Sequence, residues 1–373
     1  MGKRINKNKI ILLVVALITA ILSFSIAVFG ISYNKYNDKN SESSADLVIS
    51  SVMDLKNFAT RVREGTSYSG KTVQLKNDID CSTLSSFDPI GTRDNPFKGT
   101  FDGNGKTISN LPLCQNDYSE EHFLAKNTWS NYFGLFECID GATIKNLHID
   151  NANWTHDMGR SEDGLWGGIL VGYAKGTNNI SGILITNSSL ILSESDSEAG
   201  TWHVGGLIGK SESNCNIQNC GVMVNLKVIR NGSGSKIRMH TLLGGIAGVI
   251  DGTTQFLNNY YIGDIKVKNI YMLNYGGFVG YIGGNSSTVF GNMLQINNLE
   301  LINEYYMNHT LDDYQAISEL RFFANVGVSE NFYSTIDSKT INCGYGTVNP
   351  SAPEFSYITT LKETGTKLNK LLP

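Results

Sequence analysis

Four short glycine blocks decide the fold: GGILVG at 167–172, GGLIG at 205–209, GGIAG at 244–248 and GGFVG at 276–280. Their last glycines are 37, 39 and 32 residues apart, and the first block carries one extra residue. A block that recurs at such a period is typical of a repeat architecture, in which one small unit is stacked many times. The repeat-defining positions are Gly168, Gly172, Gly206, Gly209, Gly245, Gly248, Gly277 and Gly280.

Short runs of alternating apolar residues follow the blocks, at 180–185, 222–228, 262–270 and 299–302. This alternation predicts strands, and the Asn, Gly and Ser residues between them predict sharp corners. One coil of short strands cannot bury its inner face, whereas stacked coils share a continuous core. We therefore predict an all-β fold, a parallel β-helix solenoid over 48–350. The alternative is a propeller, whose blades need ~40–45 residues and four longer strands.

The exposed ends of a solenoid need covers, because unpaired strand edges promote aggregation. Apolar residues at helical spacing predict a capping helix over 50–64, with Ser50 or Ser51 as N-cap and Gly65 at its end. The leucines among the lysines of 351–373 predict a C-terminal cap segment.

The N-terminal part of the chain contains an apolar run at 10–31, which is long enough to span a ~30 Å hydrocarbon core. Four basic residues precede it, so we predict a single transmembrane signal-anchor with a cytoplasmic basic tail at 1–9. A polar linker follows at 32–47. A cleaved signal peptide remains the alternative, although its apolar region is normally ~7–15 residues. Both interpretations place the body outside the cell, held at the cell membrane or secreted.

The composition excludes several classes of protein. There are 39 Gly but only 6 Pro and no G-x-y period, so the chain is not a collagen. With 41% hydrophobic residues it can bury a core, unlike a disordered chain. Without the four N-terminal cations, 26 Lys and Arg face 34 Asp and Glu, a net charge of -8. A nucleic acid is therefore not an expected partner, and the only membrane contact we predict is through the N-terminal helix.

A family resemblance rests on the stretch FKGTFDGNGKTI at 97–108, together with the glycine blocks. The upstream order, from VQLKNDID at 73–80 to GLF at 134–136, strengthens it. Over about 48–345 the chain resembles the GLUG-motif proteins of bacterial cell surfaces. The resemblance implies a right-handed, pectin-lyase-like β-helix at a bacterial surface and no established reaction. Members occur in adhesin-like proteins and beside certain surface proteases.

Catalytic and metal-binding patterns are weak. Asp78, Asp80 and Asp102 are the carboxylates that an enzyme could use, but a solvated outer face with Asn77 at the corner is the favoured explanation of Asp78 and Asp80. The loop that starts at Asp102 has Lys106 where a calcium loop needs an oxygen ligand, which favours a turn. We assign no catalytic residue, metal or cofactor; whether the chain is an enzyme stays open, and a non-enzymatic chain is favoured. The six cysteines fit reduced core residues better than disulfides.

The aromatic residues supply the candidate binding site. Trp154, Trp166, Trp202 and Tyr275 lie near the repeats, and an exposed row of such rings would suit sugars or proteins. An internal aromatic stack is the alternative. We predict a surface binding or adhesion module for a glycan or a surface protein. The alternatives are a polysaccharide-active enzyme, either a lyase or a glycosidase, and a structural spacer.

Overall fold

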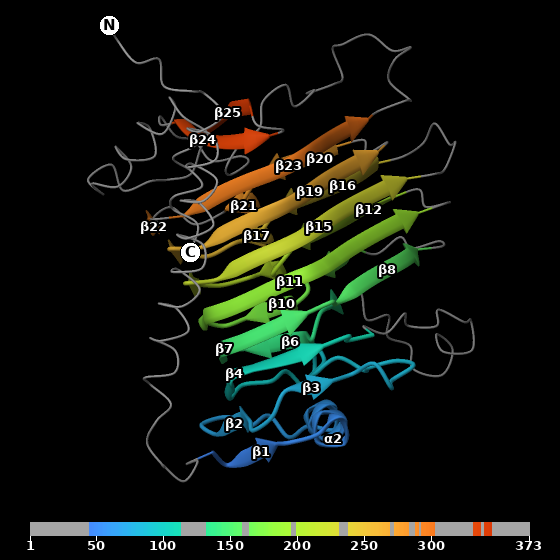
Figure 1. Cartoon of the computed structure of the whole chain (residues 1–373), viewed down its shortest axis with the longest axis vertical. Helices are drawn as coiled ribbons and strands as arrows, with labels where there is room; N and C mark the ends of the chain where they lie inside the picture. Colours follow the sequence, from blue (N-terminus) through green and yellow to red (C-terminus); the bar gives the residue numbers. More distant parts are fainter. Residues whose placement is uncertain are drawn as a thin grey trace, which may run out of the picture. The chain divides into compact units, whose positions relative to one another are not determined.

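The protein is a parallel β-solenoid built from three sheets (Figure 1). The computed structural model describes residues 45–112, 132–158, 164–194, 199–230, 238–268, 272–282, 288–290, 292–302, 331–336 and 339–344. All of them belong to one compact unit, Ala45–Gly365. Every described strand pair except the β24–β25 hairpin is parallel, which excludes the propeller, an antiparallel architecture.

The main sheet has 15 strands, and the other two sheets have five each. The main sheet contains β1 (Leu47–Ile49), β2 (Thr72–Leu75), β3 (Ile79–Asp80), β4 (Thr100–Ser109), β7 (Thr143–Asp150), β8 (Asn153–Met158), β11 (Asn178–Glu194), β14 (Cys215–Gln218), β15 (Gly221–Arg230), β18 (Thr254–Leu257), β19 (Tyr260–Lys268), β22 (Thr288–Phe290), β23 (Met293–Ile302), β24 (Asn331–Ile336) and β25 (Lys339–Gly344). The second sheet contains β6 (Phe136–Asp140), β10 (Val171–Lys175), β13 (Ile208–Ser211), β17 (Ala247–Ile250) and β21 (Val279–Ile282). The third contains β5 (Tyr132–Phe133), β9 (Leu165–Gly167), β12 (Ala199–Gly205), β16 (Arg238–Gly244) and β20 (Met272–Gly276).

The glycine blocks form the corner at which each coil passes from the third sheet to the second. Their glycines are required for space. A Cβ atom on Gly209 would lie 2.7 Å from the backbone carbon of Trp166 and 2.7 Å from the carbonyl oxygen of Gly172. Real Cβ contacts are never this short, so the sheets approach too closely at this corner for any side chain. The predicted repeat is therefore confirmed as a structural unit.

Left-handed backbone occurs instead at a bend within the main sheet. Asn146, Gly182, Asn219 and Asn258 follow one another in register and have φ between 54° and 61°. Asn is the non-glycine residue that best tolerates this conformation. Beside the bend the buried Asn259 accepts from the backbone N–H of Cys220 at 2.9 Å. The expectation that corners use Asn and Gly is confirmed. Glycine blocks form the corner between the third and second sheets, and mainly asparagines form the bend of the main sheet.

The core follows the alternation of the strands. The side chains of Ile108, Ile149, Ile185, Val222 and Tyr261 are adjacent in register and fully buried. Their neighbours along each strand point outward and are half-exposed or, at Gly221, lack a side chain. Because every coil adds the same inner position, the hydrophobic core runs along the whole stack.

Helix α2 (Val52–Arg63) covers the N-terminal end of the stack, as predicted. The Ser51 Oγ atom accepts from the Asp54 N–H at 3.2 Å, and Asp54 in turn accepts from the Ser50 N–H at 3.0 Å. This reciprocal pair satisfies two helix-start donors. The apolar face of the helix is buried on the first coils: Leu55, Phe58, Ala59 and Val62.

Two predicted segments, the apolar run at 10–31 and the C-terminal cap at 351–373, lie outside the described residues. Within the described ranges, no helix has both the length and the apolar character needed to cross a bilayer.

Candidate functional site

The outer face of the main sheet is the candidate functional site. We use "outer face" for the outward positions of β4, β7, β11, β15 and β19. One register column contains Thr107, His148, Leu184, Gly221 and Tyr260. A second column contains Ser109, Asp150, Thr186, Met223 and Ile262, with a bulge between β11 and β15. Figure 1 shows these strands stacked side by side, with this sheet toward the viewer.

A chain of hydrogen bonds crosses three strands of this face. The Oγ1 atom of Thr186 donates to Asp150 at 2.6 Å, so it accepts from His148 Nε2 at 2.8 Å. A neutral imidazole carries one proton, so this geometry puts it on Nε2 and leaves Nδ1 as an acceptor. Thr107 Oγ1 lies 3.2 Å from that Nδ1 atom and donates to it. The chain therefore fixes the tautomer and the position of His148.

Burial is the larger influence on His148, and it lowers the pKa of the imidazole. The carboxylates of Asp150 and Asp78 act in the opposite direction and are outweighed. A charged imidazole is disfavoured where water is excluded. His148 is therefore neutral at pH 7 and belongs to a rigid polar ladder.

A row of asparagines borders the polar end of the outer face. Asn151 donates to Asn110 at 2.6 Å, and Asn110 donates to Asp80 at 2.8 Å. Asn153 donates to Asn151 and accepts from Ser189 at 2.8 Å. The Asn153–Asn151 link lies within one coil and the other three join neighbouring coils, so the row immobilises side chains that would otherwise be free. A fixed polar row costs little further conformational entropy when a partner binds.

The carboxylates proposed for an enzyme are engaged in these contacts. The pKa of Asp80 is lowered by hydrogen bonds from Asn110 and from Ser82. Asp78 accepts from the backbone N–H of Thr107 at 2.8 Å, and Asp102 lies 3.3 Å from the Lys145 ammonium. A general acid needs a raised pKa near the working pH, which requires a shielded apolar setting. The hydrogen bonds to Asp80 favour its ionised form instead.

The segment that starts at Asp102 belongs to strand β4 rather than to a separate turn. Asp102 accepts from the N–H of Asn104 at 2.8 Å, and Asn104 and Gly105 both have positive φ. The pairing of β4 with β7 skips at this point, which makes the segment a bulge. Among the described residues, no group of three or more His, Cys, Asp or Glu could hold a metal ion.

The predicted aromatic row does not exist as one surface. Trp154 and Trp202 are 1% and 2% exposed and belong to the hydrophobic core. Trp166 is half-buried on the outside, where it packs on Tyr132 and Tyr173. Tyr275 aligns with the core-facing Leu243, and its side chain lies outside the described residues. Trp202 pairs with Leu165 rather than with Trp166, and this one-residue offset turns the two indoles to opposite faces.

An outward aromatic cluster was missed from the sequence. Tyr132 and Tyr173 stack at 5.0 Å between ring centroids, and Trp166 lies 4.9 Å from Tyr173. His203 stacks on Trp166 at 5.6 Å, and the Lys210 ammonium lies 5.1 Å from the same ring. Tyr132, Tyr173 and His203 are at most 8% exposed, so this cluster is a small second core rather than an open site. The sequence signal for this cluster was Trp166, which lies one position away from the core-facing Leu165 and therefore at an outward position of its strand.

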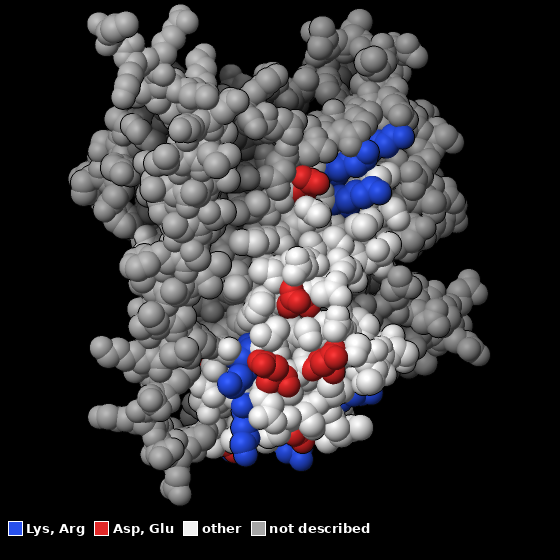
Figure 2. Space-filling model, viewed as in Figure 1, with Lys and Arg blue, Asp and Glu red and all other residues white. Residues whose placement is uncertain are grey.

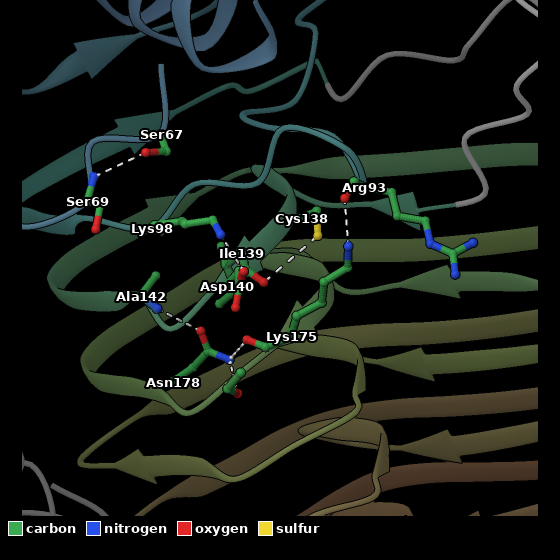
Figure 3. A network of polar contacts seen from close by, with 11 residues as sticks. Ser67, Ser69, Arg93, Lys98, Cys138, Ile139, Asp140, Ala142, Lys175 and Asn178 are labelled. Atoms are coloured by element: carbon green, nitrogen blue, oxygen red, sulfur yellow. Dashed lines mark hydrogen bonds and ion pairs between the residues drawn. The ribbon is translucent and has the colours of Figure 1, made fainter. Parts of the chain in front are cut away.

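A polar network ties the N-terminal loops to the first coils (Figure 3). Lys98 pairs with Asp140 at 2.7 Å, and the Lys175 ammonium donates to the carbonyl of Arg93 at 2.6 Å. Asn178 accepts from the Ala142 N–H at 2.9 Å and donates to the Lys175 carbonyl. Because these contacts join sequential coils to the loop beneath them, we assign the network a structural role.

Charge is distributed unevenly over the main sheet. Asp78, Asp80 and Asp150 lie at the end nearest the helix, whereas Lys227, Lys266 and Lys268 lie on β15 and β19. Figure 2 shows red side chains over the lower and middle part with blue ones beside and below them, and a blue group toward the upper right with a red side chain next to it. Lys227 and Lys266 are opposite each other in register. Asp264 also lies on β19, two residues before Lys266, and Lys145 on β7 pairs with Asp102 on β4, so the sheet is not divided into an acidic end and a basic end.

Comparisons with known proteins give a limited result. No family model matches the chain, so the GLUG resemblance and the handedness that it implies stay predictions. Halomucin from Haloquadratum walsbyi is 29% identical over 160 residues, which cover 38% of this chain and 2% of halomucin. A Bacteroides ovatus crystal structure, provisionally described as an immunoglobulin A1 protease, aligns over 83% of this chain and 84% of its own, with 15% identity and a TM-score of 0.37. The chain thus spans a very small part of halomucin, and the structural likeness is too low to support a conclusion about function.

Proposed function

We propose that this chain is a non-catalytic binding module displayed outside the cell, and that the outer face is its contact surface for another macromolecule. One observation carries the proposal: the side chains of this face are fixed by bonds that run from strand to strand. A rigid, flat array is suited to recognising a large partner, because little ordering is needed when the partner arrives.

Apolar side chains at the centre of the face support the same proposal. Leu184, Met223, Tyr260 and Ile262 are only half-buried, although they lie beside one another across three strands. Contiguous exposed apolar residues bordered by polar groups are typical of contact surfaces. The exported location rests on the predicted N-terminal segment at 10–31.

Binding can be tested with the full-length chain in mild detergent, applied to protein arrays, glycan arrays and intact bacterial cells. Met223→Glu puts a charge at the centre of the outer face and should reduce binding at least tenfold. Met53→Glu is the matched control, because Met53 is 61% exposed on α2 and away from this face. If both variants bind like the wild type, the outer face is not the contact surface.

An enzyme remains testable on the same preparation. Incubation with polysaccharides, including uronic-acid polymers, should release no products. Product formation that is abolished by Asp80→Asn would replace the binding proposal with a catalytic one.

A further inference from the structure

The outer face has polar groups on its first coils and apolar groups on its later coils. One column of outward positions, followed from strand to strand with the bulge between β11 and β15, contains Asp80, Ser109, Asp150, Thr186, Met223 and Ile262. A ligand that lies along the solenoid axis therefore meets carboxylate and hydroxyl groups first and apolar groups afterwards.

The Asp150 carboxylate is held in place and still has acceptor capacity. It accepts from Thr186 at 2.6 Å and from Asn187 at 2.7 Å, and both bonds end on its Oδ1 atom. An ionised carboxylate offers about four acceptor positions on its two oxygens. The half-exposed Asp150 can therefore accept hydroxyl groups of a ligand on Oδ2 while Oδ1 keeps it in position.

Tyr260 provides an apolar ring on the later coils. A Cβ atom on Gly221 would lie 2.7 Å from the Tyr260 Cε1 atom, so the ring occupies the space in which a side chain of Gly221 would lie. The ring lies across Gly221 toward Leu184, which is opposite Gly221 on the other side. Gly221 is buried beneath it, whereas Tyr260 and Leu184 are half-exposed. A tyrosine with an apolar ring and a polar tip suits a ligand that has both kinds of surface.

The spacing of the coils matches a ligand with a short repeat. The strands β3, β4, β7, β11, β15 and β19 follow one another in the main sheet (Figure 1). Neighbouring strands lie ~4.8 Å apart, which is close to the length of one pyranose residue in an extended polysaccharide. The distance from β3 to β19 is therefore about 24 Å, or about five sugars. Each sugar offers hydroxyl groups at its edge and C–H groups on its faces.

The charge of the column disfavours acidic polysaccharides. Asp80 and Asp150 are both ionised at neutral pH, because hydrogen bonds lower their pKa values. Neither takes part in the ion pairs found within the described ranges, and the lysines of β15 and β19 lie farther along those strands, outside the column. Uronic-acid polymers carry a carboxylate on each sugar and are repelled by like charge. A neutral polysaccharide meets no such repulsion, and its hydroxyl groups can donate to both carboxylates.

We propose that the partner of the outer face is a neutral, linear polysaccharide that lies along the solenoid axis, across the strands. This inference rests on the proposed function and names the class of partner. Hydroxyl groups of the first sugars donate to Asp80 and Asp150, and the apolar faces of the later sugars pack on Met223 and Tyr260. A few fixed polar groups beside an apolar surface are the usual means of orienting a ligand. Because these groups are held before the polysaccharide arrives, little conformational entropy is lost on binding.

Binding is measured by isothermal titration calorimetry of the full-length chain in mild detergent, with hydroxyethyl cellulose, galactomannan and polygalacturonate as probes. We expect at least one of the two neutral polymers to bind and polygalacturonate not to bind. Raising the salt from about 0.05 to about 0.5 M should change the affinity for the neutral polymer less than about twofold, because salt screens only interactions between charges. If polygalacturonate binds as tightly as the neutral polymers, or if neither neutral polymer binds, the inference is overturned.

Two substitutions of Tyr260 test the ring. Tyr260→Ala removes it and should weaken binding at least about tenfold, whereas Tyr260→Phe keeps it and should bind within about threefold of the wild type. Met53→Glu on α2 is the control and should leave the affinity unchanged. If Tyr260→Ala has the circular dichroism of the wild type and binds equally well, the ring is not part of the site and the inference is overturned.

The length of the ligand tests its direction without any variant. Oligosaccharides prepared from the neutral polymer that binds should gain affinity with each added sugar up to about five sugars, and no further. A plateau already at about two sugars would show that the ligand does not run from coil to coil, and it would overturn the inference.

The outcomes separate this inference from the proposed function. A protein ligand, found in place of a polysaccharide and lost in Met223→Glu, overturns the inference and retains the proposed function. If no ligand of any class is sensitive to Met223→Glu, both are overturned.

Discussion

Replacing Gly209 with alanine tests the reason for the glycine blocks. The added methyl group would lie 2.7 Å from the Trp166 backbone carbon and 2.7 Å from the Gly172 carbonyl oxygen. Both neighbours are backbone atoms of the preceding coil, so no side-chain rotation can relieve the contact. Overpacking usually costs ~1–3 kcal/mol, and the upper end applies here because the backbone must move. We expect a loss of about 3 kcal/mol in the free energy of unfolding, measured by urea denaturation.

Gly167→Ala is the matched control, because it lies in the same corner. A Cβ atom on Gly167 would be 3.6 Å from Trp154 and 3.7 Å from Leu165, which are ordinary contacts. The equivalent position is Val204 in the next coil, so a side chain is already accepted there. The variant should be within ~1 kcal/mol of the wild type, or slightly more stable. Equal losses for Gly167→Ala and Gly209→Ala would refute the steric explanation.

Three further predictions follow from single groups. Burial lowers the pKa of His148 in the folded chain below its ordinary value of 6.5, so below pH 6.5 the unfolded chain binds more protons than the folded chain. Stability should therefore fall as the pH drops from 7 to 5. His148→Gln should flatten this part of the plot of urea midpoint against pH. The buried thiols of Cys138, Cys215 and Cys220, whose pKa values are raised by burial to about 12, should resist iodoacetamide in the native chain and react in 8 M urea; rapid native labelling would contradict their placement. Arg63→Ala removes the guanidinium that lies 2.7 Å from the 5%-exposed Glu137 carboxylate and should cost about 2 kcal/mol, whereas the double variant with Glu137→Gly should recover part of that loss.

The repeat and the cap were predictable because they are local. A strand with one face on the core must alternate apolar and polar residues, and this pattern is visible in a single sequence. The start of a helix needs capping residues, which are also visible in a single sequence. The alternation around Ile180 and Val222 and the Ser51 cap are examples. The glycines of the blocks were recognised as well. The reason for them, which is the close approach of backbone atoms from the neighbouring coil, has no local signal in the sequence.

The aromatic site was not predictable in the same way. Trp166 and Trp202 both precede a glycine block, but the first block is one residue longer than the second. Trp202 is therefore opposite Leu165, and the Trp166 side chain points to the other side of the sheet from the Trp202 side chain. The outer face was missed for a related reason. Thr107, His148 and Thr186 are far apart in the sequence, and only the coil length brings their hydrogen-bonding groups together.

Hydroxyl-radical footprinting of the full-length chain, free and bound, tests the outer face most directly. Exposed methionines are oxidised readily, and burial in an interface protects them. In the free chain, both Met223 and Met53 should be oxidised. At a concentration or ligand level where binding is complete, Met223 and Tyr260 should become protected and Met53 should not. Unchanged oxidation of Met223 in the bound state would contradict the assignment of this face as the contact surface.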